Sequence, residues 1–188
     1  MAIRDIVPFP DPILKQRCAE VEVFDAELHQ LLDDMADTMG EADGLGLAAN
    51  QVGVSLRIFV MDVPIDDDTR TGRIEVINPK VKAKRGELKY EEGCLSFPGV
   101  HENVIRAAEL DLDFVDRHGQ PQAVTARGLV SVCIQHELDH LDGITFVDRL
   151  SPLKRRIVLR DYLRENRELI EDAQHKARLR ARQTGVQG

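Results

Sequence analysis

Residues 135–140 constrain what this chain can fold into more than any other segment, because they read Gln-His-Glu-Leu-Asp-His. Residues four apart on an α-helix lie one above the other on the same face. His136 and His140 can therefore direct both imidazoles at one cation, with the Glu137 carboxylate beside them. The pattern H-E-x-x-H on a helix is typical of a metal site at which a carboxylate moves the proton of a water molecule.

Length and cysteine usage limit the class of protein. A chain of 188 residues, 43% of them hydrophobic, is long enough for one domain with its own core. The three cysteines have no regular spacing, which argues against a disulfide framework and favours a reducing compartment. The longest stretch without Asp, Glu, Lys or Arg, residues 44–56, is too short to cross a bilayer, and no signal-peptide core precedes it. We therefore expect a soluble, cytoplasmic protein.

Hydrophobic periodicity predicts an α+β fold over residues 1–170. In it, antiparallel or mixed β-sheets pack around a central metal-binding helix, with an N-terminal helix and a C-terminal helix. Asp25 can cap the first helix, which carries an apolar stripe to about Met39. The apolar run at residues 128–141 predicts the central helix, which Gly143 ends, and Pro152 begins the last helix.

Alternating and β-branched segments predict the strands of this fold. We expect Pro79 to close one strand and Gly86 to form a bulge within the next. The turn at residues 116–119 predicts a hairpin between the last two strands. The expected strands cover residues 56–63, 74–78, 81–90, 104–115 and 122–126.

The C-terminal end is basic although the chain as a whole is acidic. Residues 154–182 hold ten Lys or Arg and five Asp or Glu, a balance of +5 against −8 for the whole chain. Such a tail predicts an anionic partner. The alternative is a solvated helix with ion pairs, for example between Arg164 and Asp161. Apolar residues thin out beyond Glu171, so residues 171–188 are expected to form a basic tail whose helix can fray.

A catalytic metal site needs a third protein ligand and leaves one position open for water. Upstream, Cys94 lies between Gly93 and Leu95 in a segment bounded by glycine and proline, and a thiolate is a strong, soft ligand. Gly93 would let the backbone approach closely, so that the Leu95 N–H points at a substrate oxygen. The alternative for Cys94 is a buried hydrophobe. Downstream, the acidic candidates for the third ligand are Asp142, Asp148, Asp161 and Glu165.

Cys133 lies three residues before His136 and therefore on the same side of the helix. It could be a ligand, but three positions on one helix cannot easily all reach one tetrahedral centre. We interpret it as part of the apolar wall beside the metal, with Leu129 and Val132.

Residues 44–51 form a loop of small residues, Gly-Leu-Gly-Leu-Ala-Ala-Asn-Gln. Two glycines indicate a backbone that something approaches closely. A phosphate-binding loop does not fit, because no Lys-Ser or Lys-Thr follows and the loop comes after a helix. The Gln51 amide can bind an oxyanion, although a glutamine in a loop is usually solvated.

Together these three segments resemble the three motifs of the peptide deformylase family: G-x-G-x-A-A-x-Q, E-G-C-L-S and Q-H-E-x-D-H. They stand complete and in order at residues 44–51, 92–96 and 135–140. The likeness continues at residues 10–14, 77–79 and 150–154, and it covers the chain to about residue 170.

This resemblance implies an enzyme that removes the N-formyl group from the N-terminal formyl-methionine of newly made polypeptides and releases formate. It implies that Cys94, His136 and His140 bind one divalent metal ion, with Fe²⁺ as the native ion and Zn²⁺, Ni²⁺ or Co²⁺ able to replace it. Glu137 is then the general base and later the acid. Gln51 and the Leu95 N–H are implied to form the oxyanion hole.

The methionine side chain of the substrate needs an apolar slot beside the metal. We expect the peptide that follows it to add as a strand, with hydrogen bonds to backbone near Gly46 and Gly93. By resemblance Tyr90 and Phe97 line the mouth. Because metal sites usually need residues that hold the ligands in place, we expect Asp139 to fix a neighbour such as Arg106. The expected substrate-binding residues are Leu45, Gly46, Tyr90, Glu92, Gly93, Phe97, Leu129, Val132 and Cys133.

His101 stands where some family members carry an arginine near the substrate, which leaves the preference for later peptide residues undetermined. The implied partners are formyl-Met nascent peptides and the ribosomal RNA surface near the exit tunnel, which the basic tail would contact. We expect no membrane and no DNA partner.

Two other functions are open on the sequence alone. A metallo-endopeptidase would cleave internal peptide bonds and take its third ligand from downstream. A structural metal site, or an inactive relative that acts as a ribosome-binding module, would have its metal enclosed by four protein ligands.

Overall fold

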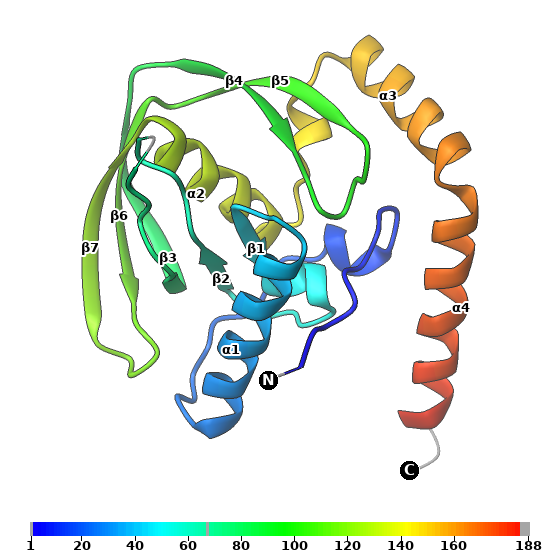
Figure 1. Ribbon diagram of the computed structural model, residues 1–188, viewed down its shortest axis with the longest axis horizontal. Coiled ribbons are helices and arrows are strands. Elements are labelled where there is room, and N and C mark those ends of the chain that lie inside the picture. Colours follow the sequence, from blue (N-terminus) through cyan, green and yellow to red (C-terminus); the bar gives the residue numbers. More distant parts are fainter. Residues whose placement is uncertain (1, 67, 185–188) are drawn as a thin grey trace.

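The computed structural model describes residues 2–66 and 68–184, and it places two antiparallel sheets around a central helix (Figure 1). The larger sheet has the order β1-β2-β3-β6-β7, and β4 pairs with β5 in the smaller one. This arrangement confirms the predicted α+β class. The strands are β1 (Gly46–Ala48), β2 (Ile58–Met61), β3 (Ile74–Arg85), β4 (Leu88–Gly93), β5 (His101–Arg106), β6 (Glu109–Val115) and β7 (Pro121–Arg127).

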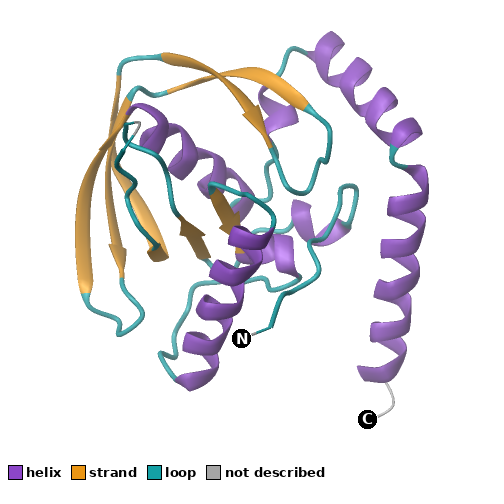
Figure 2. Ribbon diagram, viewed as in Figure 1, coloured by secondary structure: helices purple, strands orange, loops and turns teal. Residues whose placement is uncertain are grey.

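Four α-helices and three short 3-10 helices complete the described part of the chain (Figure 2). Within those residues, no helix is both long and apolar enough to cross a membrane. The helices are α1 (Ala26–Glu41), α2 (Gly128–Leu141), α3 (Pro152–Glu165) and α4 (Arg167–Thr184), and the 3-10 helices are η1 (Pro12–Lys15), η2 (Ala49–Val52) and η3 (Phe146–Arg149).

The larger sheet is covered by α1 on one face and by α2 on the other. In β2, Ile58 and Val60 pack against the apolar stripe of α1, whereas Phe59 and Met61 pack against α2. A strand buried on both faces has no polar side, which explains why this segment reads as a continuous apolar run. As predicted, α1 begins after Asp25, whose side chain accepts a hydrogen bond from the Leu28 N–H at 3.0 Å.

The chain passes through Pro79 without leaving the sheet, so the prediction that Pro79 closes a strand is wrong. Register shifts at residues 77–80 and 81–83 interrupt the pairing of β3 with β6, and Asn78 adopts a positive φ of 51°. A proline is tolerated at such a bulge because the ladder is already interrupted there. The bulges let one long strand bend where two shorter strands were expected.

The predicted bulge at Gly86 is also wrong. Gly86, with φ of 64°, lies in the turn between β3 and β4, where the chain leaves the larger sheet for the smaller one. The strand expected over residues 104–115 divides in the same way into β5 and β6. Between them, the Ala107 backbone bonds to the Gln135 side chain of α2, with distances of 3.1 Å from its N–H and 2.9 Å to its carbonyl. The predicted hairpin of β6 and β7 is confirmed.

The helix α2 runs from Gly128 to Leu141 and stops at Gly143, whose φ is 74°, as predicted. The C-terminal region differs from the prediction, because one expected helix is two, with a break at Asn166. These two helices lie along the side of the molecule away from β6 and β7 (Figure 1). Of the tail expected at residues 171–188, residues 171–184 belong to α4, and residues 185–188 lie outside the described residues.

Candidate metal centre and active-site cavity

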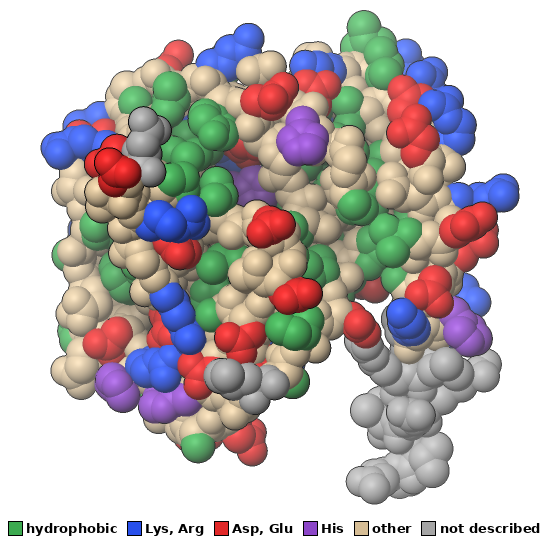
Figure 3. Space-filling model, in the orientation of Figure 1, with side chains coloured by type: hydrophobic (Ala, Val, Ile, Leu, Met, Phe, Trp, Pro, Cys, Tyr) green, Lys and Arg blue, Asp and Glu red, His purple; other side chains and the backbone are tan. Residues whose placement is uncertain are grey.

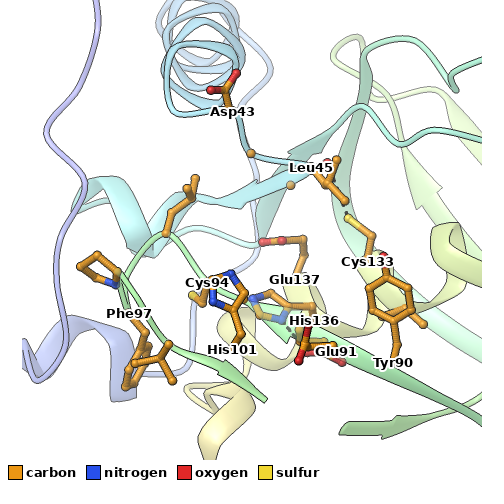
Figure 4. Close-up of a pocket in the computed structure, with 18 of the residues that line it drawn as sticks. Asp43, Leu45, Tyr90, Glu91, Cys94, Phe97, His101, Cys133, His136 and Glu137 are labelled. Carbon is orange, nitrogen blue, oxygen red and sulfur yellow. Dashed lines mark hydrogen bonds and ion pairs between the residues drawn. The ribbon is translucent and has the colours of Figure 1, made fainter. Parts of the chain in front are cut away.

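A cavity of about 440 Å³ opens between the sheets. It is lined by the loop before β1, by β4 and the turn that follows it, and by one face of α2 (Figure 4). Seen from outside, the surface is hollowed at this point between hydrophobic side chains, with histidine visible in the hollow (Figure 3). Three sequence segments that are far apart in the chain therefore meet at one place.

Cys94 and His136 line this cavity, and His140 lies buried beside them. One ligand atom from each lies within 4.8 Å of the other two, and the Cys94 sulfur is 3.2 Å from Nε2 of His140. Within residues 2–66 and 68–184, no other group of three His, Cys, Asp or Glu comes together in this way. The histidines come from consecutive turns of α2, and the cysteine comes from the turn after β4.

The ring of His136 is held by a carboxylate behind it. Its Nδ1 lies 2.8 Å from Oε2 of Glu92, which leaves Nε2 to face the cysteine and the other histidine. Arg106 donates to the same carboxylate at 2.7 and 2.9 Å. Burial acts to raise the pKa of Glu92, but the bonds from Arg106 and His136 outweigh it and hold that pKa below its usual range.

The expected pairing of Asp139 with Arg106 is present, and Arg149 also donates to Asp139. This buried network connects α2, β4 and β5 behind the metal ligands. Glu92 was expected among the substrate-binding residues, but both of its carboxylate oxygens are bonded to Arg106 and His136. Its side chain is therefore engaged in holding His136, as carboxylates beside metal-binding histidines usually are.

His140 is completely buried, and its Nδ1 has no hydrogen-bond partner among the described residues. Burial is the largest cause that lowers the pKa of His140 well below its usual range. The ring is therefore neutral, with a lone pair available to a cation. One sulfur and two imidazole nitrogens that converge on a cavity are the donor set that divalent transition-metal ions take. The residues present thus fit a metal ion.

Glu137 points into the cavity beside these three residues (Figure 4). It is buried, and its Oε2 has no hydrogen-bond partner among the described residues. Burial raises the pKa of Glu137 to about 7. A carboxyl group that titrates near neutral pH can both accept and return a proton.

Gly46 faces the same carboxylate. A Cβ on Gly46 would lie 2.4 Å from Oε1 of Glu137 and 3.0 Å from the sulfur of Cys133. The expectation that the small-residue loop allows a close approach is confirmed at this position.

Gln51 is buried and is not the solvated glutamine of an ordinary loop. Its Oε1 accepts a hydrogen bond from the Ala48 N–H at 2.9 Å, while its Nε2 donates to Ser96 Oγ at 3.2 Å and lies 3.5 Å from the Cys94 sulfur. The Leu95 N–H, at the cavity wall, has no acceptor among the residues that the structure describes. Two N–H donors therefore border the metal centre.

The apolar slot residues also line the cavity. Tyr90, 37% exposed, lies near Cys133 at the mouth (Figure 4). Phe97 was expected at the mouth too, but it is completely buried, because its ring stacks on Phe9 with centroids 4.6 Å apart. The predicted slot residues that line the cavity are Leu45, Leu129, Val132 and Cys133.

Burial raises the pKa of the Cys133 thiol well above its usual value, and the nearby charge of Glu137 adds to the shift. The thiol is therefore protonated, and it donates to the Leu45 carbonyl at 3.6 Å. Cys133 is not one of the three converging ligands.

The downstream acidic residues considered as third ligands lie outside the metal group. Asp142 pairs with Arg57, Asp148 with Arg155, and Asp161 with Arg160. Glu165 pairs with Arg164, so all four candidates are engaged with arginines and the upstream Cys94 is the third member of the metal group.

Sequence reasoning missed two residues of the site. Asn50 is completely buried, and its Nδ2 donates to the His140 carbonyl at 2.7 Å, which anchors η2 to the end of α2. Ser96 fixes the Gln51 amide. Both lie inside the motifs: Asn50 precedes Gln51, and Ser96 follows Leu95. This proximity in sequence was the one feature that could have indicated a role for them. His101 lies at the cavity rim, where a Cβ on Gly93 would approach its ring to 2.9 Å.

Comparison with known proteins gives a consistent result. A family model described as polypeptide deformylase matches residues 3–156. The peptide deformylase of Aquifex aeolicus is 46% identical over 160 residues, which cover 85% of this chain and 95% of that protein. The one from Chromobacterium violaceum is 49% identical over 154 residues, 82% of this chain and 90% of that protein.

Solved structures agree with the sequence comparisons. A crystal structure of a peptide deformylase from Legionella pneumophila is similar with a TM-score of 0.82 and 44% identity, covering 89% of this chain and 98% of that one. The peptide deformylase from Ehrlichia chaffeensis in complex with actinonin gives 0.84 and 37%, covering 89% and 99%.

Proposed function

The chain belongs to the polypeptide deformylase family, and from this premise we propose how its own residues remove the N-formyl group from nascent peptides. It is a metal-dependent hydrolase that acts on the N-terminal formyl-methionine and releases formate. This family membership removes the metallo-endopeptidase and the structural metal site as functions of the chain.

Cys94, His136 and His140 hold one divalent metal ion. The convergence of their ligand atoms within 4.8 Å supports this assignment, as does the neutral state of His140. Glu92 keeps Nε2 of His136 directed at the ion by accepting the Nδ1 proton. When bound, the ion lowers the pKa of a water at the site and polarises the formyl carbonyl.

Glu137 moves the proton during hydrolysis. Its carboxylate takes a proton from the attacking water and then returns that proton to the nitrogen of the methionine as the C–N bond breaks. Burial raises the pKa of Glu137 in the metal-free protein, and this makes its carboxylate a stronger base for the proton of the water. The products are formate and a free N-terminal amine.

The formyl oxygen gains negative charge as the carbonyl carbon becomes tetrahedral. Nε2 of Gln51 and the N–H of Leu95 donate to that oxygen. The hydrogen bond from Ala48 to Gln51 fixes the amide in advance, so no reorganisation is needed when charge develops. Losing one such donor costs roughly 10²–10³ in rate.

The substrate methionine occupies the slot formed by Leu45, Leu129, Val132 and Cys133, with Tyr90 at its mouth. The rest of the peptide lies as an added strand against backbone near Gly46 and Gly93, with Phe97 buried beneath the turn. Recognition through main-chain hydrogen bonds suits an enzyme that acts on many different N-termini.

The observation that carries this mechanism is the meeting of three distant segments at one cavity, with Glu137 beside the metal group. Its test is formate release from formyl-Met-Ala by the wild type and by the Glu137→Ala variant, with metal content measured on the same samples. The variant should keep its metal and lose turnover. An unformylated peptide serves as the control, and its cleavage would contradict the assignment.

Fe²⁺ is the proposed native ion, with Zn²⁺, Ni²⁺ or Co²⁺ able to occupy the site after purification. A site with one soft sulfur and two nitrogens accepts all of these ions. Elemental analysis after anaerobic purification, with formate release assayed on the same sample, identifies the active form. Activity that survives air and peroxide without loss would argue against iron, because Fe²⁺ and a bound thiolate are both oxidised.

The proposed location is the cytoplasm, and the proposed second partner is the ribosome near its exit tunnel. Arg156, Arg160, Arg164 and Arg167 are exposed on α3 and the start of α4, which supports docking on ribosomal RNA. Replacing Arg156, Arg160 and Arg167 by Gln should weaken co-sedimentation with ribosomes. The slope of log K against log salt should fall by about one unit for each phosphate that the variant no longer neutralises. Binding unchanged from that of a control variant, Arg127→Gln on β7, would exclude this partner.

A further inference from the structure

Helix α3 contacts the rest of the molecule through one apolar face, where Val158 and Leu159 are partly buried, and through ion pairs of Lys154 and Arg155. Tyr162 is its one buried residue, 1% exposed, and the next buried position of the C-terminal region is Ile170 in α4. Tyr162 belongs to the same hydrophobic cluster as Phe97, which lies in the loop that joins β4 to β5. That loop begins with Cys94.

The Tyr162 hydroxyl contacts two backbone carbonyls from distant segments. It donates to the Phe9 carbonyl at 3.0 Å and lies 3.4 Å from the Ser96 carbonyl. The Phe9 N–H donates to the same Ser96 carbonyl at 2.9 Å, so the three groups form one cluster. Burial raises the pKa of Tyr162 to about 12, and the hydroxyl is therefore a donor at any physiological pH.

The Tyr162 ring packs against the same loop. Its centroid is 5.0 Å from that of Phe97 and 6.2 Å from that of Phe9. Phe97 in turn meets Phe146 edge-on at 5.5 Å, and Cys94 packs against the margin of this cluster. Aromatic pairs at these separations resist displacement in specific directions.

The segments that Tyr162 joins are the ones that carry the reacting groups. Residues 94–97 supply the metal-binding sulfur, the Leu95 N–H and the Ser96 hydroxyl that fixes Gln51. The segment before Phe9 reaches Gln51 directly, because the Val7 N–H donates to the Gln51 carbonyl at 2.7 Å. The Tyr162 hydroxyl therefore contacts both the segment that carries Cys94 and the N-terminal segment that bonds to Gln51.

We propose that Tyr162 is a positioning residue of the deformylation reaction, by which α3 holds residues 94–97 in the orientation that the Cys94 sulfur and the Leu95 N–H require. The inference rests on the proposed function, in particular on its metal centre and oxyanion donors. It makes the C-terminal helix a part of the catalytic support of this chain, in addition to any role on its outer surface.

The hydroxyl and the ring can be separated by substitution. Tyr162→Phe keeps the packing of the ring and removes only the hydroxyl, which donates its one proton to the Phe9 carbonyl at 3.0 Å and contacts the Ser96 carbonyl at 3.4 Å. A displacement of about 1 Å at reacting groups can cost up to 10²-fold in rate, and a smaller shift of a still-packed loop should cost about 5-fold. The loss should fall on kcat, with KM changed by less than about 2-fold, because the apolar slot is formed by other residues.

The decisive measurement uses the full chain loaded with Co²⁺, whose thiolate-to-metal absorption reports the geometry at Cys94 without any turnover. Wild type, Tyr162→Phe and Leu163→Ala are compared for this spectrum, for kcat and KM on formyl-Met-Ala, and for the melting temperature. Leu163, on the same helix and 40% exposed, is the matched control. We expect Tyr162→Phe alone to shift the absorption band and lower kcat at a temperature far below melting.

Two outcomes overturn the inference: an unchanged spectrum and kcat in Tyr162→Phe, or a rise in KM at constant kcat. If Tyr162→Leu lowers the melting temperature while Tyr162→Phe matches the wild type throughout, Tyr162 supports only stability. If the proposed metal centre is wrong and Cys94 is not a ligand, the wild type itself will bind Co²⁺ without a thiolate-to-metal absorption band. That result is distinct from a change seen in Tyr162→Phe alone.

Discussion

Glu92 holds His136 from behind: Nδ1 of the histidine lies 2.8 Å from Oε2 of the glutamate, although 44 residues separate them in the chain. The same carboxylate balances the charge of Arg106, which also pairs with Asp139. One buried residue therefore orients a metal ligand and neutralises a cation.

The first prediction concerns this carboxylate. Glu92→Gln keeps an acceptor for one partner but leaves the buried Arg106 charge without full compensation. Breaking a buried pair costs about 3 kcal/mol or more in the free energy of unfolding, and loss of a carboxylate behind a metal-binding histidine lowers metal affinity about 10–100-fold. Urea unfolding and chelator competition measure the two effects. Glu91→Gln, an exposed neighbour on β4, is the control, and equal metal affinity in both variants would contradict the role of Glu92.

Gly46→Ala tests the contact between the first and third motifs. The added Cβ would meet Oε1 of Glu137 at 2.4 Å and must push that carboxylate out of place. Because general acid–base catalysis contributes at least about 10², formate release should fall about 10²-fold while the fold persists. Gly40→Ala in α1, where nothing lies within 4 Å of the new Cβ, should leave activity unchanged. Wild-type kcat in Gly46→Ala would show that the Glu137 carboxylate is not fixed here.

Glu137 should also destabilise the metal-free protein as the pH rises. Burial raises its folded pKa to about 7, above the usual value of 4.5, so folding favours the protonated form. Stability from this group is therefore complete below pH 4.5 and is lost as the pH rises through 7. Glu137→Gln should remove this dependence and unfold at higher urea than the wild type at about pH 8, while its kcat falls by about 10²–10⁴. A variant that is less stable than the wild type under those conditions would contradict this.

Asp148 gives the opposite pH dependence. Burial acts to raise its pKa, but bonds from Lys15 and Thr145 outweigh this and lower the pKa to about 2. The ionised form is favoured in the folded state, so the stabilisation is complete above about pH 4 and is lost as the pH falls through about 2. A shift from 3.8 to about 2 corresponds to about 2 kcal/mol. Asp148→Asn should cost about that much near neutral pH and little at about pH 2, measured by urea unfolding. The control is Asp113→Asn, whose side chain is 50% exposed.

Local chemistry made much of this fold and site predictable. The apolar periodicity of residues 128–141 and the spacing of His136 and His140 define a helix with both imidazoles on one face, and this needs no information from elsewhere in the chain. The same holds for the Asp25 cap of α1 and for the hairpin of β6 and β7. In each case the interacting groups are close in sequence.

The predicted strand boundaries were wrong where a segment distant in the sequence provides the backbone with hydrogen bonds or with a pairing partner. Pro79 would end an isolated strand, yet bulges beside β6 keep it inside the sheet. The strand expected to run through Ala107 breaks because the Gln135 side chain of α2 takes over its backbone hydrogen bonds. The residues next to Pro79 and Ala107 in the sequence give no indication of β6 or of Gln135 as their partners.

The sequence by itself determined the central helix and the residue types able to bind a metal and move a proton, because helix geometry and side-chain chemistry are local properties. Only the tertiary structure decided that Glu92 holds His136, that Ser96 fixes Gln51, and that Tyr162 reaches the cysteine loop from the far end of the chain. These contacts depend on how the chain folds back on itself. Hydrogen-bond partners brought together by packing leave no periodic signal along the sequence.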